Sequence, residues 1–139
     1  MERLTEHPVL LVEDSDEDRE AIERALHASH PHLRLEFVTD GGAALARLRD
    51  PGLERPRLVF LDLNMPGIDG LGVLEQIRAE PGLADITVVV FTSSTTAQDI
   101  DRCYAAGADS YIYKPVDFTL FRTVLQGTVD YWTGAASDG

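Results

Sequence analysis

The chain contains very little cysteine: Cys103 is its one cysteine among 139 residues. An intrachain disulfide is therefore impossible. Neither a second thiol nor a nearby base marks Cys103 as a reactive thiolate. We interpret it as a filler residue on a helix rather than as a catalytic group.

Positive charge is also scarce. The sequence has 12 lysines and arginines against 24 aspartates and glutamates, which gives a formal net charge of -12 and a pI near 4.5. Phosphate backbones and anionic membranes attract clusters of lysine and arginine, which this chain lacks. We expect no direct binding to nucleic acid or to a membrane, so that partners are proteins or small ligands.

Long apolar runs are absent as well. No stretch reaches the roughly 18 residues that span a bilayer, and the first eight residues contain no signal-peptide core. We therefore expect a cytoplasmic protein. The length and the 44% hydrophobic content fit one domain over residues 1–139, with its core over about 7–131 and a short flexible tail at 134–139.

Short apolar runs alternate with segments of helical periodicity. The predicted strands cover residues 9–12, 33–38, 58–61, 87–91 and 110–113. The predicted helices cover about 17–30 after a Ser15 or Asp16 cap, 41–50, 71–80, from Thr95 or Thr96 to Ala106, and from the cap Asp117 towards Trp132. Strand 58–61 is apolar without alternation, as in parallel sheets covered on both faces. Five such units predict a doubly wound α/β fold.

Polar side chains follow four of these strands. Glu13 and Asp14 follow the first, Asp62 the third, Thr92 the fourth and Lys114 the fifth. With strand order 2-1-3-4-5, the first and third strands are neighbours and the order reverses between them, which is where ligands bind in open parallel sheets. The three carboxylates are therefore expected to converge.

Converging carboxylates require a cation, because like charges raise one another's pKa. Oxygen ligands favour Mg²⁺. Lys114 offers a positive charge to an anion, and Thr92 offers a hydroxyl to a phosphoryl oxygen. Since phosphoryl transfer needs little beyond positioning and charge neutralisation, these groups suffice around an acceptor, for which we select Asp62.

These residues resemble those of two-component response-regulator receiver domains over about residues 7–131. The resemblance is carried by Glu13-Asp14, Asp62 within LDLNMPGIDG, Thr92-Ser93, Tyr111 and Lys114-Pro115. It implies a flavodoxin-like (βα)5 fold with a five-stranded parallel sheet in the order 2-1-3-4-5. It further implies that Asp62 accepts a phosphoryl group from a sensor histidine kinase and that Thr92 and Lys114 hold it. Glu13, Asp14, Asp62 and the Asn64 carbonyl would bind Mg²⁺.

The same resemblance implies a switch in which Thr92 moves towards the phosphoryl group and Tyr111 turns inward. Asn64 and Ser94 match positions that tune dephosphorylation, and the Lys114–Pro115 peptide is expected to be cis. The family promotes only its own phosphorylation and dephosphorylation, so we do not expect an enzyme. Glu13 stands where aspartate is commoner, which leaves open whether it binds Mg²⁺ directly or through water.

The exit of the first helix, with His30-Pro31-His32, resembles stand-alone receivers that pair with phytochrome-type kinases. No effector segment follows Tyr131, so the expected output is a downstream protein target or a histidine phosphotransfer protein. A homodimer through the last two helices and the edge strand is a further expectation. Its surface would include Tyr104, Tyr113, Tyr131 and Trp132, for which ordinary packing is an equal alternative.

Two other functions compete with this interpretation. A phosphatase of the haloacid-dehalogenase type also uses an aspartyl nucleophile, but it needs an acid where this chain has Asn64, and its nucleophile lies on the first strand. A degenerate receiver would be a constitutive interaction module, against which the intact acid, hydroxyl and lysine set argues. His27, His30 and His32 lack an acid or thiol set and are interpreted as solvated surface residues rather than metal ligands.

Overall fold

The computed structural model describes residues 7–65, 67–93 and 96–133. Five parallel strands form one sheet in the order β2-β1-β3-β4-β5. The strands are β1 (Val9–Val12), β2 (Leu35–Val38), β3 (Leu58–Leu61), β4 (Thr87–Thr92) and β5 (Ser110–Tyr113), and the helices are α1 (Asp16–Ser29), α2 (Gly41–Arg49), α3 (Gly70–Ala79), α4 (Ala97–Ala105) and α5 (Phe118–Thr133). The predicted flavodoxin-like fold is confirmed.

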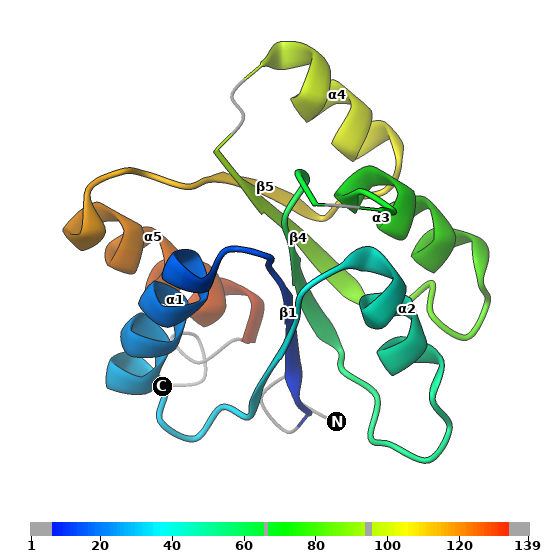
Figure 1. The fold of residues 1–139 in the computed structure, drawn as a ribbon, viewed down its shortest axis with the longest axis horizontal. Coiled ribbons are helices and arrows are strands. Elements are labelled where there is room, and N and C mark those ends of the chain that lie inside the picture. The colour runs from blue at the N-terminus through cyan, green and yellow to red at the C-terminus, as the bar shows by residue number, and fades with distance from the viewer. Residues whose placement is uncertain (1–6, 66, 94–95, 134–139) are drawn as a thin grey trace.

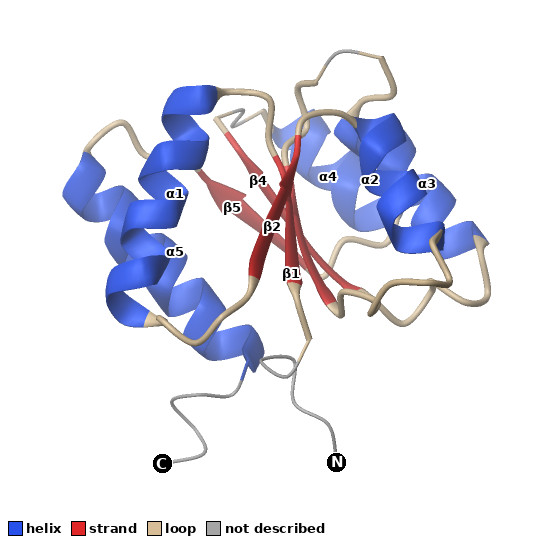
Figure 2. Ribbon diagram, turned by 60° about the horizontal axis from the view of Figure 1, so that its bottom comes forward, coloured by secondary structure: helices blue, strands red, loops and turns tan. Residues whose placement is uncertain are grey.

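The sheet lies between two layers of helices (Figures 1 and 2). Helices α1 and α5 cover one face, and α2, α3 and α4 cover the other. Each interface has its own apolar cluster, one built around Leu26, Phe60 and Leu125 and the other around Leu45, Leu74 and Val90. Both faces of the central strands are therefore buried, which explains why β1 and β3 are apolar without alternation.

Strand register brings the ends of β1 and β3 together. Val12 pairs with Leu61, and the Asp62 N–H donates to the Val12 carbonyl (3.1 Å). Because the two strands are parallel and aligned, the residues that follow them, Glu13 and Asp62, emerge at the same edge of the sheet.

Side chains cap the helices at the predicted places and decide the alternatives that the sequence left open. The N-cap of α1 is Ser15, whose Oγ accepts from the Asp18 N–H (3.2 Å), and the N-cap of α4 is Thr96. Asp117 caps α5 by accepting from the Leu120 N–H (2.9 Å). Gly107 adopts φ +105° after α4, in the region that glycine occupies at low cost.

Two expectations from sequence are modified. The described residues include no cis peptide bond, so the Lys114–Pro115 peptide is trans and the cis expectation was wrong. Proline makes the free-energy difference between the cis and trans peptide small, but trans is still preferred. Strand β2 begins at Leu35 rather than at residue 33. The tail at 134–139 lies outside the described residues.

His30 also differs from its interpretation as a solvated residue. Its side chain is 11% exposed, and its Nε2 lies 2.6 Å from Asp130 Oδ1 on α5 while its Nδ1 lies 2.6 Å from Ser29 Oγ. Two hydrogen-bond partners explain why this histidine can be half-buried at the end of α1. It links α1 to α5 and belongs to no cluster of metal-ligating side chains found among the described residues.

None of the helices within the described ranges combines the length and the apolar character that crossing a membrane requires.

Arg78 on α3 joins three segments at the opposite edge of the sheet from Glu13 and Asp62. Its guanidinium donates to the carbonyls of Gly107 (2.9 Å), Ala84 (2.9 Å) and Ile86 (2.6 Å), and to Asp109 Oδ2 (2.8 Å). Replacing Arg78 by alanine removes the donor from the three carbonyls, while Asp109 Oδ2 keeps its hydrogen bond from the Val88 N–H (2.8 Å). We expect Arg78→Ala to lower the free energy of unfolding by about 2–3 kcal/mol, measured by urea denaturation.

Arg49→Ala is the matched control, because Arg49 pairs with Glu80 in a contact whose side chains are 44% and 36% exposed. Its loss should cost about 1 kcal/mol or less. Equal costs for the two variants would contradict the structural role assigned to Arg78.

Candidate functional site

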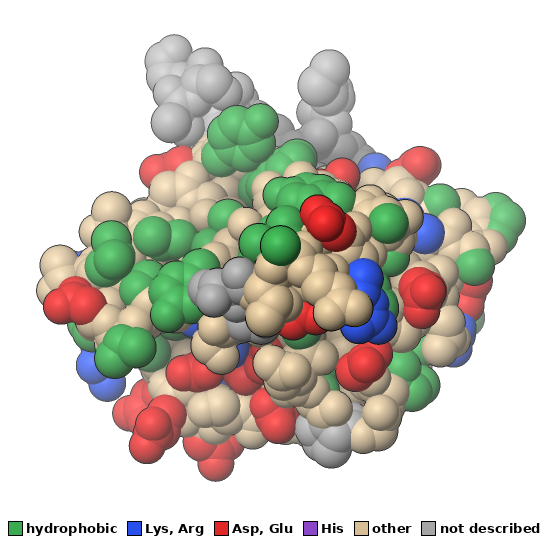
Figure 3. All heavy atoms as spheres, turned by 90° about the horizontal axis from the view of Figure 1, so that it is seen from above, with side chains coloured by type: hydrophobic (Ala, Val, Ile, Leu, Met, Phe, Trp, Pro, Cys, Tyr) green, Lys and Arg blue, Asp and Glu red, His purple; other side chains and the backbone are tan. Residues whose placement is uncertain are grey.

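Three carboxylates converge at the carboxyl edge of the sheet, as expected. Glu13 and Asp14 follow β1, Asp62 follows β3, and one oxygen of each lies within 4.8 Å of the others. Glu13 is 4% exposed and Asp62 is 8% exposed, whereas Asp14 is exposed. Figure 3 shows the molecule of Figure 1 from above, and acidic side chains gather on this face. An all-oxygen set of this kind fits Mg²⁺ or a similar hard cation.

Lys114 places an ammonium group against these acids. Its Nζ donates to Glu13 Oε1 (2.5 Å) and to Asp62 Oδ2 (3.3 Å), and it lies 5.7 Å from the centre of the Phe91 ring. The side chain is 9% exposed. Lys114 follows β5, which is the outermost strand of the sheet. Its long side chain nevertheless extends to Glu13 and Asp62 at the ends of β1 and β3.

A third acid contacts Lys114 and was not predicted from the sequence. Asp18 Oδ2 on the first turn of α1 accepts a hydrogen bond from Lys114 Nζ at 3.0 Å. In the sequence Asp18 is one of several acids at the start of a helix, where acids are common because of the helix dipole. The one signal for Asp18 in the sequence was its place in the first turn of the helix that follows Glu13 and Asp14.

The buried position of Glu13 changes its protonation. Burial raises the pKa of Glu13 to about 7, and the adjacent Lys114 opposes this rise while Asp62 adds to it. The pKa of Lys114 is raised, because its contacts with Glu13, Asp62 and Asp18 outweigh the opposing effect of burial. Glu13 therefore carries a proton in part near neutral pH when no metal ion compensates its charge.

This shift predicts a pH dependence of stability. The folded state holds the Glu13 proton more tightly than the unfolded state, whose pKa is near 4.5. The contribution of Glu13 to stability is therefore full below pH 4.5 and is lost as the pH rises through about 7. In EDTA, we expect the free energy of unfolding of the parent to fall relative to Glu13→Gln across this interval, measured by urea denaturation at each pH.

The comparison with Glu13→Gln cancels groups that titrate in both proteins. The raised pKa of Lys114 adds nothing to the difference in this interval, because its stabilising effect is lost only above its ordinary value of 10.5. A difference between parent and variant that stays constant with pH would contradict the raised pKa of Glu13.

The loop after Asp62 contacts the Asp62 carboxylate. The Asn64 N–H donates to Asp62 Oδ1 (3.2 Å), while the Asn64 side chain is exposed. Helix α3 begins directly behind Asp62, where a Cβ on Gly70 would lie 2.2 Å from the Asp62 carbonyl oxygen. Glycine at position 70 therefore permits a close approach that any other residue would prevent.

Thr92 and Tyr111 lie on the neighbouring strands β4 and β5. Thr92 ends β4 and is fully buried, and Tyr111 on β5 is half-buried against the apolar cluster beneath α2, α3 and α4. Tyr111 pairs with Val90, so Thr92 lies two residues along β4 from the partner of Tyr111. Residues two apart on a strand share a face, which places Thr92 and Tyr111 on the same side of the sheet. Ser94 lies outside the described residues.

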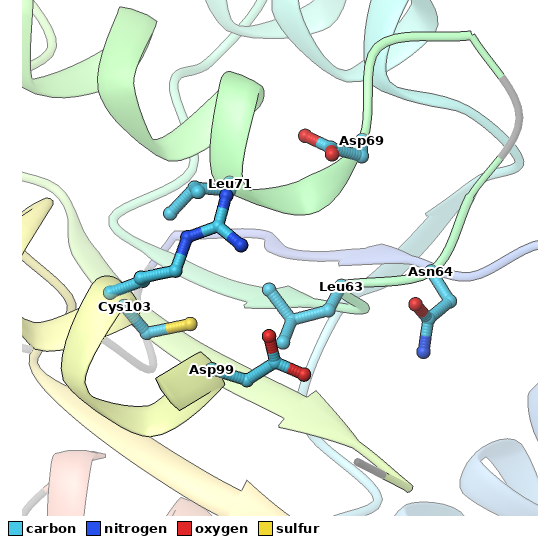
Figure 4. A pocket seen from close by; sticks show the side chains of 7 residues that line it. Leu63, Asn64, Asp69, Leu71, Asp99 and Cys103 are labelled. Atoms are coloured by element: carbon cyan, nitrogen blue, oxygen red, sulfur yellow. The ribbon is translucent and has the colours of Figure 1, made fainter. Parts of the chain in front are cut away.

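A pocket lies between the loop after β3 and helices α3 and α4 (Figure 4). Asn64, Asp69, Asp99 and Cys103 are among the side chains that line it. Cys103 is 1% exposed, and burial raises the pKa of its thiol. A thiol of raised pKa is a poor nucleophile, which agrees with the interpretation of Cys103 as a packing residue.

The aromatic residues near the chain end divide into two groups. Tyr104, Tyr113 and Tyr131 are exposed, together with Val116 and Leu120. Trp132 is half-buried and donates from Nε1 to Ser110 Oγ (3.2 Å), so it contributes to packing between α5 and β5. The exposed residues are spread over α4, β5, the segment after β5, and α5.

Known proteins resemble this chain in sequence. The response regulator receiver domain family matches residues 9–126. The probable methanogenesis regulatory protein FilR2 of Methanothrix harundinacea is 39% identical over 129 residues, spanning 91% of this chain and 83% of the relative. The response regulator Rcp1 of Synechocystis is 35% identical over 128 residues, spanning 89% of this chain and 87% of the relative.

Two solved structures have the same fold over nearly their full length. The phosphorylated cyanobacterial phytochrome response regulator RcpA superposes with a TM-score of 0.87 at 33% identity, covering 93% of this chain and 95% of that one. The Mn²⁺-bound form of Rcp1 superposes with a TM-score of 0.85 at 34% identity, covering 91% and 94%. The strand order, the acidic edge and these matches have one explanation: the chain belongs to the response regulator receiver domain family.

Proposed function

We propose that this chain is a phosphoacceptor response regulator in which Asp62 receives a phosphoryl group from the phosphohistidine of a sensor kinase. One observation carries the proposal: Glu13, Asp14 and Asp62 meet at one edge of the sheet, and the Lys114 ammonium group contacts Glu13 and Asp62 there. This arrangement has the charge needed for a divalent cation and for a phosphoryl group that arrives beside it.

The transfer proceeds by displacement at phosphorus. A carboxylate oxygen of Asp62 forms a bond to phosphorus as the bond between phosphorus and the donor imidazole nitrogen breaks, and the imidazole nitrogen keeps the bonding electron pair. Mg²⁺, when bound by Glu13, Asp14, Asp62 and the Asn64 carbonyl, supplies neutralising charge to the phosphoryl oxygens. Lys114 binds one phosphoryl oxygen and the Thr92 hydroxyl donates to another. Water reverses the modification by attack on phosphorus, at a rate that Asn64 and Ser94 tune.

The response passes from Thr92 to Tyr111 in this proposal. Movement of Thr92 towards a phosphoryl oxygen vacates space on the face of the sheet that Tyr111 shares, and the tyrosine ring turns inward to fill it. The change alters the surface formed by α4, β5 and α5. That surface is where a downstream target, a histidine phosphotransfer protein or a second copy of the chain would bind.

The proposed kinase is of the phytochrome type. This part of the proposal is supported by the similarity to RcpA, a phytochrome response regulator, at 33% identity. The net charge of -12 agrees with signalling through proteins rather than nucleic acid.

Radiolabelled acetyl phosphate tests the acceptor function without knowledge of the kinase. With Mg²⁺, we expect label to reach about one phosphoryl group per chain, to be released by hydroxylamine as acyl phosphates are, and to be absent in EDTA. Hydrolysis of added phosphate monoesters would indicate a haloacid-dehalogenase-type phosphatase instead. Absence of both label and beryllofluoride binding would indicate a degenerate receiver.

A further inference from the structure

Asp18 is the carboxylate around Lys114 that the proposed function leaves without a role. Lys114 Nζ contacts Glu13 at 2.5 Å, Asp18 at 3.0 Å and Asp62 at 3.3 Å. In the proposed function, Glu13 binds the metal ion and Asp62 binds both the ion and the phosphoryl group. Asp18 is assigned to neither, so it is the one partner free to stay with Lys114 throughout the reaction.

The position of Asp18 is fixed by the start of α1. Ser15 Oγ accepts from the Asp18 N–H (3.2 Å), and the Ser15 N–H donates to Glu13 Oε2 (3.2 Å). The same turn of chain therefore connects the backbone of Asp18 to the buried acid. The Asp18 side chain is 39% exposed while that of Glu13 is 3% exposed, so Asp18 meets the ammonium group from the solvent side.

We infer that Asp18 is a positioning residue, whose carboxylate holds the Lys114 ammonium group beside Asp62 when Glu13 and Asp62 engage the metal ion and the phosphoryl group. The inference rests on the proposed function. A lysine side chain has many rotamers, so an ammonium group without a fixed partner would spread over several positions. Asp18 restricts the Lys114 ammonium group to the position that faces Asp62.

The alternative is that Asp18 serves only the dipole of α1. Asp16 and Glu17 occupy the same first turn and serve the dipole equally. Both are exposed, and the ion pairs of Lys114 within the described part of the chain include neither. Glu17→Gln is therefore a matched control for Asp18→Asn, because each removes one negative charge from the same turn of helix.

Lys114 is the only lysine in the sequence, which makes it directly observable. Protein labelled with ¹³C and ¹⁵N in lysine gives one side-chain ammonium signal by NMR. Without metal, we expect hydrogen exchange of this group with water to be about fivefold faster in Asp18→Asn than in the parent, as for loss of one charge-assisted hydrogen bond. Glu17→Gln should match the parent.

Phosphorylation by acetyl phosphate with Mg²⁺ gives the second measurement. We expect Asp18→Asn to lower the maximal rate constant about fivefold while the half-saturating donor concentration stays within about twofold, since positioning affects the transition state rather than donor binding. Glu17→Gln should retain the parent rate.

An unchanged exchange rate or maximal rate in Asp18→Asn overturns the inference, as does an equal slowing in Glu17→Gln. Failure of the parent itself to take up phosphoryl would refute the proposed function instead. The exchange measurement would still decide whether Asp18 holds Lys114.

Discussion

Asp62→Asn is expected to reduce phosphoryl uptake from acetyl phosphate by about two orders of magnitude or more, because the amide is a far weaker nucleophile than the carboxylate. Uptake would be measured as label bound to the protein after a fixed time with saturating Mg²⁺. Borohydride reduction of the labelled parent, followed by peptide mapping, should place the modification at residue 62.

Loss of folding cannot account for this result. Asp62 lies beside Glu13 and Asp14, so removing its charge relieves repulsion among the three acids. We expect Asp62→Asn to be at least as stable as the parent in EDTA. Asp101→Asn, which changes an exposed aspartate on α4, should take up phosphoryl at the parent rate. Parent-like labelling of Asp62→Asn would exclude Asp62 as the acceptor.

Lys114→Met is expected to cause the largest loss of stability at the site. The variant removes the ammonium group that contacts Glu13, Asp18 and Asp62, and leaves two nearly buried carboxylates without it. Breaking a buried ion pair from one side costs about 3–5 kcal/mol. Since Glu13 can take up a proton, we expect a decrease of about 2–4 kcal/mol in the free energy of unfolding at neutral pH in EDTA, measured by urea denaturation.

Mg²⁺ distinguishes an electrostatic cause from a packing defect. A divalent cation bound by the acids replaces the lost positive charge, so saturating Mg²⁺ should restore much of the stability of Lys114→Met. The double variant Glu13→Gln, Lys114→Met should be more stable in EDTA than Lys114→Met alone, because the buried charge is gone. A Lys114→Met protein as stable as the parent in EDTA would contradict this account of the site.

The convergence of Glu13, Asp62 and Lys114 could be predicted because it depends on local patterns and one topological rule. Each residue directly follows an apolar run, and parallel strands all end at the same edge of the sheet. Helix starts were predictable for a similar reason: the caps Ser15 and Asp117 accept hydrogen bonds from backbone only three residues away.

Other features could not be read from the sequence. Asp18 meets Lys114 across 96 residues of chain, and His30 meets Asp130 across 100. Either acid would serve equally well as a solvated residue on a helix, so residue type alone does not indicate its partner. The trans peptide at Pro115 is a similar case, because proline narrows the energy gap between isomers and leaves the surrounding structure to select one.

The sequence by itself determined the order of strands and helices and the edge of the sheet at which the chemistry lies, since apolar periodicity and capping act over a few residues. Only the tertiary structure decided which acids share the Lys114 ammonium group, which of them are buried, and that the pKa of Glu13 rises to about 7. These properties depend on the solvent excluded and the charges brought near by packing between α1, β1, β3 and β5, and that packing joins residues far apart in the chain.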